Sequence, residues 1–213
     1  MTVLRYVLAL VLVVMIGLSP APAAAIDAGE ARKTVQGATV AGLATFTGKT
    51  YPLAERSRLL EDLLRRYTDQ TLLSASILGR YWPRLTPAEQ AAFSDLFLRY
   101  LVSSYVGLLR NLEPGLTIEI GAAEDLGPKA RVLSTAHLPS QPGAPVPVEW
   151  EVAATSDGRL VIMDFAAQGI SLIRAMHDDF ASVMRSSGGK IEPLMDALRR
   201  KIDANDQANA ATG

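Results

Sequence analysis

Side chains that could perform covalent or metal chemistry are scarce in this 213-residue sequence. It has no cysteine, and its two histidines are His137 and His177. No G-x-S-x-G nucleophile motif occurs, so the sequence gives little support to nucleophilic or zinc-based catalysis. His177-Asp178-Asp179 contains three possible metal ligands, but consecutive helical residues point about 100° apart and cannot chelate one ion together. We therefore interpret His177 as a partly buried helix residue and His137 as a solvent-facing strand residue.

Two other segments match known kinds of site only in part. Ser187-Gly188-Gly189-Lys190 is similar to part of a phosphate-binding loop, but it lacks the first glycine of G-x-x-x-x-G-K-[ST], and Ile191 replaces the hydroxyl residue. We interpret it as a helix break. Asp164 is a carboxylate in an apolar stretch, with no second acid or histidine near it in the sequence. A structural role is favoured, in which Asp164 accepts hydrogen bonds from the turn at Gln168-Gly169.

The clearest predicted helix begins after Thr86. Thr86 is a favourable N-cap, Pro87 suits the first helical position, and Glu89 completes a capping box. Apolar and aromatic residues then recur at i, i+3, i+4 and i+7, which predicts one broad face for a dense core or for the wall of an apolar pocket. That face comprises Phe93, Leu96, Phe97, Tyr100, Leu101, Ser104, Tyr105 and Leu108.

Three more helices are predicted before this one. They cover residues 28–46, 52–66 and 69–82, and Pro83 stops the last of them. The helix over residues 52–66 has an apolar side, and we expect its charged residues, Arg56 among them, to form a solvated face.

After Asn111 the apolar period changes from 3.6 to 2, which predicts strands. Short turns between them favour an antiparallel meander. With two closing helices, this pattern predicts an α+β domain, in which a helical lobe packs on a curved four-stranded antiparallel sheet. The predicted strands cover residues 116–120, 130–138, 146–154 and 160–165, and the closing helices cover residues 170–187 and 191–202.

The N-terminus has the features of a secretory signal peptide. Arg5 precedes an apolar run of about 12 residues, which is too short to span a bilayer, and Ala23-Ala24-Ala25 favours cleavage after Ala25. We therefore expect removal of residues 1–25, a single domain over residues 26–205 in the periplasm, and a disordered tail over residues 206–213. The formal net charge of −1 argues against nucleic acid as a partner.

The order of several short segments resembles that of one protein family. They are Leu78-Gly-Arg-Tyr-Trp82, Leu85-Thr-Pro-Ala-Glu-Gln90, Phe93-x-x-x-Phe97-x-x-Tyr100-Leu101, Tyr105, Val148-Glu-Trp150, Asp157-Gly158, Met163-Asp164 and Gly169-Ile-Ser171. Behind a signal peptide, they resemble the MlaC family of periplasmic phospholipid-binding proteins, also called the toluene-tolerance family. The resemblance covers most of the mature chain. The chain departs from the family pattern at Met163, where an aromatic residue is common, and at Gln168, where Glu is common.

The resemblance implies a fold loosely like that of nuclear-transport-factor-2 proteins, with an apolar cavity for acyl chains between helices and sheet. It implies a soluble lipid shuttle without cofactor or catalytic role, whose cargo is phospholipid. The implied partners are an inner-membrane substrate-binding protein with its ABC permease and ATPase, and an outer-membrane lipoprotein complex; we expect a monomer. The candidate lipid-binding residues are Leu73, Ile77, Tyr81, Phe93, Phe97, Tyr100, Leu101, Val132, Val148, Trp150, Val152, Ile170, Ile173 and Phe180.

Three alternatives remain open at this point. A hopanoid-associated branch of the family is similar, so the cargo could be a hopanoid or another lipid. A small periplasmic enzyme of the same shape could use Asp164 or His177. An interaction module with a filled core would have no cavity at all.

Overall fold

The computed structural model describes residues 25–211. The predicted signal peptide lies outside this range except for Ala25. None of the helices within the described range is long and apolar enough to cross a bilayer. The elements are α2 (Ala28–Phe46), α3 (Leu53–Tyr67), α4 (Gln70–Leu78), the 3-10 helix η1 (Gly79–Arg84), α5 (Pro87–Tyr105), the 3-10 helix η2 (Leu108–Asn111), β1 (Thr117–Asp125), β2 (Lys129–His137), β3 (Val146–Ala154), β4 (Leu160–Ala167), β5 (Ile170–Ser171), α6 (Leu172–Ser186) and α7 (Glu192–Ala211).

The predicted start of α5 is confirmed. The Glu89 backbone N–H donates to Thr86 Oγ1 at 3.3 Å, and the Thr86 N–H donates to Glu89 Oε2 at 2.7 Å, so both halves of the capping box form. Asp27 and Asp69 cap α2 and α4, each accepting a backbone N–H from the first turn of its helix. Local hydrogen bonding therefore determines where these helices begin.

The third predicted helix ends earlier than the sequence suggests. α4 stops at Leu78, because Gly79 has a φ of +50°, which a right-handed helix excludes. A Cβ at Gly79 would also lie 3.0 Å from Cε1 of His177, so α6 can approach closely only at a glycine. The chain continues to Arg84 as a 3-10 helix.

All strands belong to one antiparallel sheet in the order β1-β2-β3-β4-β5. The four predicted strands are confirmed, and β5 is an additional strand of two residues. It pairs with β4 through a turn in which Gln168 and Gly169 both have positive φ, +52° and +79°, as in a type I′ hairpin. Because this hairpin intervenes, α6 begins only after Ser171, whose hydroxyl accepts the N–H of Arg174.

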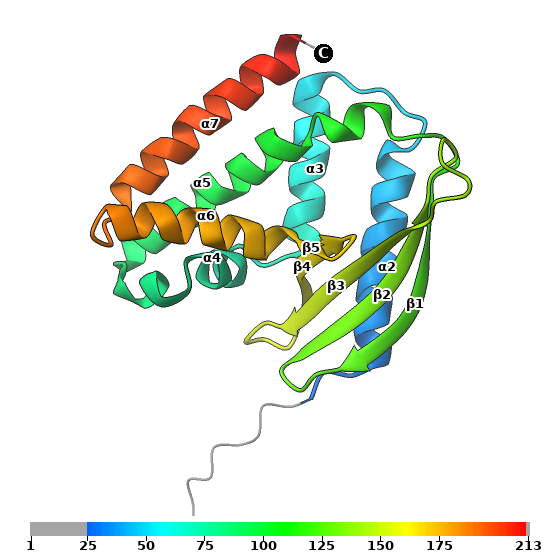
Figure 1. The fold of residues 1–213 in the computed structure, drawn as a ribbon, viewed down its shortest axis with the longest axis horizontal. Coiled ribbons are helices and arrows are strands. Elements are labelled where there is room, and N and C mark those ends of the chain that lie inside the picture. Colours follow the sequence, from blue (N-terminus) through cyan, green and yellow to red (C-terminus); the bar gives the residue numbers. More distant parts are fainter. Residues whose placement is uncertain (1–24, 212–213) are drawn as a thin grey trace, which may run out of the picture.

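One face of the sheet is covered by α2 (Figure 1). Ala31 and Val35 of α2 are fully buried and pack against Val132, Val152 and Ile162 of the sheet. The predicted alternation in β2 and β3 is thus confirmed, since the buried positions of both strands are apolar except for Ser134 of β2.

The outer face of the sheet is charged and exposed. Arg131 of β2 lies 3.7 Å from Glu124 and 3.7 Å from Glu149 on the neighbouring strands. Such exposed pairs contribute at most about 1 kcal/mol each, so this face is solvated rather than tightly held. His137 is exposed at the end of β2, as predicted, with Nε2 3.8 Å from Glu119.

A second core lies among α4, α5, α6 and α7, beyond β4 (Figure 1). Phe93 and Phe97 of α5 stack with ring centroids 5.8 Å apart, and Phe180 of α6 meets Phe97 edge-on at 6.0 Å. Val161 and Met163 of β4 pack against the same cluster. The N-terminal part of the apolar face of α5 is therefore plain core.

The C-terminal helix is longer than the sequence suggests. A disordered tail is expected from residue 206, whereas α7 continues to Ala211. Asn205 Nδ2 donates to Ser104 Oγ at 3.0 Å, and Asn209 Nδ2 donates to the carbonyl of Ser103 at 2.8 Å. These polar contacts fix the last turns of α7 to α5. Because the contacting residues are polar, the sequence shows no apolar period there that would predict a helix.

Candidate functional site

A cavity of about 490 Å³ lies between the two cores, where the helices and the sheet do not fill the space between them. Its size is within the range of about 300–1,000 Å³ that small-molecule sites occupy. The lining side chains are overwhelmingly apolar and come from both the helices and the sheet. A module with a filled core would lack such a space, so the structure does not support that alternative.

One wall of the cavity comes from α2 and α3. The α3 residues recur at i, i+3, i+4 and i+7 and form a single stripe. On α2, Gly42 leaves a gap, because a Cβ there would meet no atom within 4 Å. The wall residues are Ala38, Thr39, Gly42, Leu43 and Phe46 from α2, and Leu60, Leu63, Leu64 and Tyr67 from α3.

The other walls come from Thr68 after α3, from α4, from the end of α5, from the segment leading into β1, from the sheet and from the start of α6. Their side chains are almost all apolar or aromatic. They are Thr68, Leu73, Leu101, Tyr105, Leu109, Leu112, Leu116, Ile118, Trp150, Ile162, Met163, Asp164, Phe165, Leu172 and Ile173.

The structure brings four of the fourteen predicted lipid-binding residues to the cavity wall, namely Leu73, Leu101, Trp150 and Ile173. Most of the others lie in the packed cores instead, and Ile170 is 71% exposed at the β4–β5 turn. Contact of any of the fourteen with a lipid stays a prediction. In the helical core are Ile77, Tyr81, Phe93, Phe97 and Phe180, with Tyr100 packed against it; Val132 and Val152 lie beneath α2, and Val148 is buried in β3.

The sequence pattern does not identify several residues of the cavity wall. The apolar stripe of α3 is visible in the sequence, but it reads as one side of a short surface helix. In α2 the small residues weaken the helical period, so Leu43 and Phe46 do not stand out as members of a wall. Leu109 and Leu112 precede the first strand in a segment without regular period, and only tertiary placement brings them to the cavity.

Asp164 is the acidic residue on the cavity wall within residues 25–211. Its carboxylate accepts the backbone N–H groups of Phe165 at 2.8 Å and Ile173 at 3.0 Å, and it accepts the hydroxyl of Ser171. This is a structural role of the kind the sequence predicts, although the donors are Phe165 of β4, Ser171 and Ile173 rather than Gln168-Gly169.

His177, the other candidate for catalysis, is half-buried on α6. Its Nδ1 lies 2.8 Å from the carbonyl oxygen of Ile77, near the end of α4. The ring therefore joins α6 to α4, and His177 is not among the residues that line the cavity. Across residues 25–211, no three His, Cys, Asp or Glu side chains gather in a way that could hold a metal ion.

Polar groups on or near the wall have few partners. Thr39 Oγ1 is buried and has no hydrogen-bond partner among the described residues. Tyr105 is half-buried, and burial raises the pKa of its phenol, with a smaller contribution from Tyr100 in the same direction. Arg56 of α3 is 3% exposed, so the expectation that it belongs to a solvated face is wrong.

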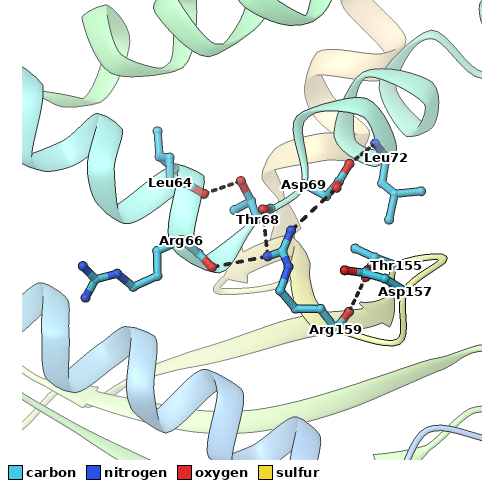
Figure 2. A network of polar contacts seen from close by, with 8 residues as sticks. All are labelled: Leu64, Arg66, Thr68, Asp69, Leu72, Thr155, Asp157 and Arg159. Carbon is cyan, nitrogen blue, oxygen red and sulfur yellow. Dashed lines mark hydrogen bonds and ion pairs between the residues drawn. The ribbon is translucent and has the colours of Figure 1, made fainter.

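A polar corner joins α3 to α4 (Figure 2) and includes Thr68, which borders the cavity. The guanidinium of Arg159, from the β3–β4 hairpin, lies 3.4 Å from the carbonyl oxygen of Arg66, 3.5 Å from that of Thr68 and 3.7 Å from the Asp69 carboxylate. A cation at the C-terminal end of α3 interacts favourably with the helix dipole. Because Thr68 lies on the cavity wall, Arg159 fixes the position of that wall relative to the sheet.

Comparison with known proteins gives a family and a fold. The sequence model of the family described as MlaC protein matches residues 41–200. Among solved structures, the chain is similar to a phospholipid-binding protein from Ralstonia solanacearum, determined in complex with a phospholipid. The two chains are 24% identical with a TM-score of 0.72, over 83% of this chain and 98% of that chain. At this identity the likeness establishes a shared fold.

The family match includes α3 to α6, the whole sheet and every cavity wall except the part formed by Ala38 and Thr39. It also includes the segments whose order resembles the family in the sequence. On this evidence, the chain belongs to the MlaC family.

Proposed function

We propose that this protein is a periplasmic carrier that holds phospholipid acyl chains in its cavity. It moves lipid between the outer and inner membranes for an ABC transport system that maintains lipid asymmetry. The observation that carries the proposal is the apolar cavity of about 490 Å³ between the helices and the sheet. Family membership and the phospholipid bound by the Ralstonia protein support the same cargo.

The physical need for such a carrier follows from the cost of exposing acyl chains to water. Each buried CH₂ group is worth about 0.8 kcal/mol, so a two-chain lipid crossing water alone is disfavoured by on the order of 20 kcal/mol. A carrier has to supply apolar surface and needs no chemical step. The engagement of Asp164 and His177 in structural hydrogen bonds agrees with a role that does not use them as catalysts.

The proposal includes two docking partners. One is an inner-membrane substrate-binding protein with its permease and ATPase, and the other is an outer-membrane lipoprotein complex. The predicted signal peptide supports a periplasmic location, in which a carrier could reach both membranes.

Transfer between vesicles tests the proposal. Donor vesicles carry a fluorescent phosphatidylethanolamine with a quencher, and acceptor vesicles carry neither. We expect the protein to accelerate dequenching in proportion to its concentration, and Gly42→Phe, which fills part of the cavity, to reduce that acceleration. Gly42→Ala is the matched control, since one methyl group occupies little of the space. Transfer at the same rate with and without the protein would contradict a carrier role.

A further inference from the structure

The β4–β5 hairpin presents exposed apolar side chains. Within residues 25–211, Phe165 and Ile170 are among the large apolar residues that are exposed, at 38% and 71%. Phe165 also borders the cavity, so it lies at the rim, where the cavity wall meets solvent. A single exposed apolar residue needs no explanation, but two that continue a cavity wall indicate a contact surface.

The strand register places both side chains on one face of the sheet. Ile170 pairs with Ala167, which is two residues after Phe165. Phe165 in turn pairs with Trp150, and the two rings have centroids 5.4 Å apart. Paired residues of adjacent strands share a face, and so do alternate residues of one strand. An apolar row therefore runs from the cavity wall at Trp150, through Phe165, to Ile170 at the turn.

The hairpin and the loop beside it contain no charged residue. Residues 165–173 have none, and neither do residues 138–148, which connect β2 to β3. The two segments meet, because the Gln168 backbone N–H donates to the carbonyl oxygen of Pro147 at 3.1 Å. By contrast, residues 155–159 of the β3–β4 turn, at the opposite end of the sheet, include two charged side chains (Figure 1).

These features fit a lipid bilayer better than a protein partner. A stable protein interface buries more than about 1,000 Å² in total and surrounds its apolar centre with hydrogen-bonding groups. The hairpin offers two large apolar side chains and the amide of Gln168. Aromatic and apolar side chains beside uncharged polar groups are typical of segments that enter the boundary between lipid headgroups and acyl chains. The first charge after the hairpin is the exposed cation Arg174, which suits anionic headgroups.

We propose that the β4–β5 hairpin, through Phe165 and Ile170, is the surface by which this protein contacts a phospholipid bilayer. A rim that enters the bilayer interface gives acyl chains an apolar route between the membrane and the cavity wall. The chains then do not have to cross water, where they would lose the free energy of apolar burial. The inference rests on the proposed function, because it takes the cavity to be the place where acyl chains are held.

Fluorescence from a single labelled position tests the contact. The chain has no cysteine, so Ile170→Cys provides one attachment site for a polarity-sensitive fluorophore. When vesicles of phosphatidylethanolamine and phosphatidylglycerol are added, we expect its emission to shift to shorter wavelength and to gain intensity. Leu126→Cys is the matched control, because Leu126 is also exposed but lies in the β1–β2 turn at the other end of the sheet. Its emission should not change.

A substitution tests whether the contact matters for transfer. Ile170→Ser removes apolar surface that is exposed in the free protein, so the unfolding temperature should stay that of the parent. Binding to the same vesicles, measured by flotation, should weaken by at least about threefold, because less apolar surface enters the bilayer. Lipid transfer between vesicles should slow as well. Leu126→Ser should change neither vesicle binding nor transfer.

Three outcomes would overturn the assignment. The label at position 170 responds to vesicles no more than the label at position 126, or Ile170→Ser transfers lipid as fast as the parent. In the third, the label at position 170 responds to added protein without vesicles, which would make the hairpin a contact between two copies of the chain. In each case the parent still transfers lipid, so the proposed function stands. If the parent transfers no lipid, the proposed function itself fails, and this inference fails with it.

Discussion

The indole N–H of Trp150 donates a hydrogen bond of 2.8 Å to Ser134 Oγ, across the adjacent strands β3 and β2. Ser134 in turn donates to the carbonyl oxygen of Val148 at 3.3 Å. A buried indole is favourable only where its N–H has a partner. The hydroxyl at position 134 therefore allows a large aromatic side chain to form part of an otherwise apolar cavity wall.

Removing this hydroxyl should cost stability. Ser134→Ala leaves the Trp150 N–H unpaired in a half-buried position, and we expect a loss of about 1–3 kcal/mol in the free energy of unfolding. Urea unfolding measures it. Ser156→Ala, at an exposed serine, should stay within about 0.5 kcal/mol of the parent. Equal effects of the two substitutions would mean that the Trp150–Ser134 bond contributes nothing.

A small and a large side chain at Gly42 should have different effects on stability and on lipid content. Gly42→Ala adds a methyl group within a helix and meets no neighbour within 4 Å, so we expect a gain in stability of about 0.5–1 kcal/mol with lipid content unchanged. Gly42→Phe should leave α2 folded and reduce the lipid that copurifies. Lipid extraction and thermal unfolding measure both effects. Full lipid content in Gly42→Phe would place the acyl chains elsewhere.

Alkaline pH should weaken the fold through Tyr105. Burial, with Tyr100, raises the pKa of the Tyr105 phenol above its unfolded value of about 10. The stabilising contribution of the neutral phenol is thus complete below about pH 10 and is lost as pH rises through the folded pKa. Tyr105→Phe cannot ionise, so its stability should fall less steeply above about pH 10. Urea unfolding at several pH values tests this, and parallel curves for the two proteins would contradict it.

The corner held by Arg159 should control how tightly one wall is fixed (Figure 2). Arg159→Ala removes contacts to the carbonyl oxygens of Arg66 and Thr68 and to Asp69. Because the contacts are long and partly exposed, the global loss should not exceed about 1 kcal/mol. Amide exchange in residues 66–72 should nevertheless accelerate, while Arg199→Ala, which breaks an exposed pair with Asp196, should leave it unchanged. Unchanged exchange in Arg159→Ala would show that the corner is held by other contacts.

The features that sequence reasoning predicts best are those set by local interactions. The capping box of Thr86 and Glu89 depends on residues three apart, and the alternation of β2 and β3 follows from one buried sheet face. Both are confirmed. The sequence indicates a turn at Gln168-Gly169 but not the strand β5 after it, because the hairpin requires a positive φ at Gln168 that few residues other than glycine adopt.

The cavity wall is harder to predict because a core and a void can have the same apolar lining. Phe97 and Leu101 lie one turn apart on one face of α5, yet Phe97 packs against Phe180 while Leu101 borders the cavity. Phe97 and Leu101 differ because different neighbouring elements pack against them. The apolar periodicity of a helix does not show which elements will pack against each residue. Arg56 is a similar case: its spacing from Leu60 places it on the inner stripe of α3, but its charge favours a prediction of exposure.

Mass spectrometry of lipid extracted from the protein tests the central claim most directly. The full chain is expressed with its predicted signal sequence and purified without added lipid or detergent. The account predicts phospholipid bound in near-stoichiometric amount to the parent and a clearly reduced amount in Gly42→Phe. A folded protein that yields no lipid under these conditions would contradict the claim that the space between helices and sheet is made for acyl chains.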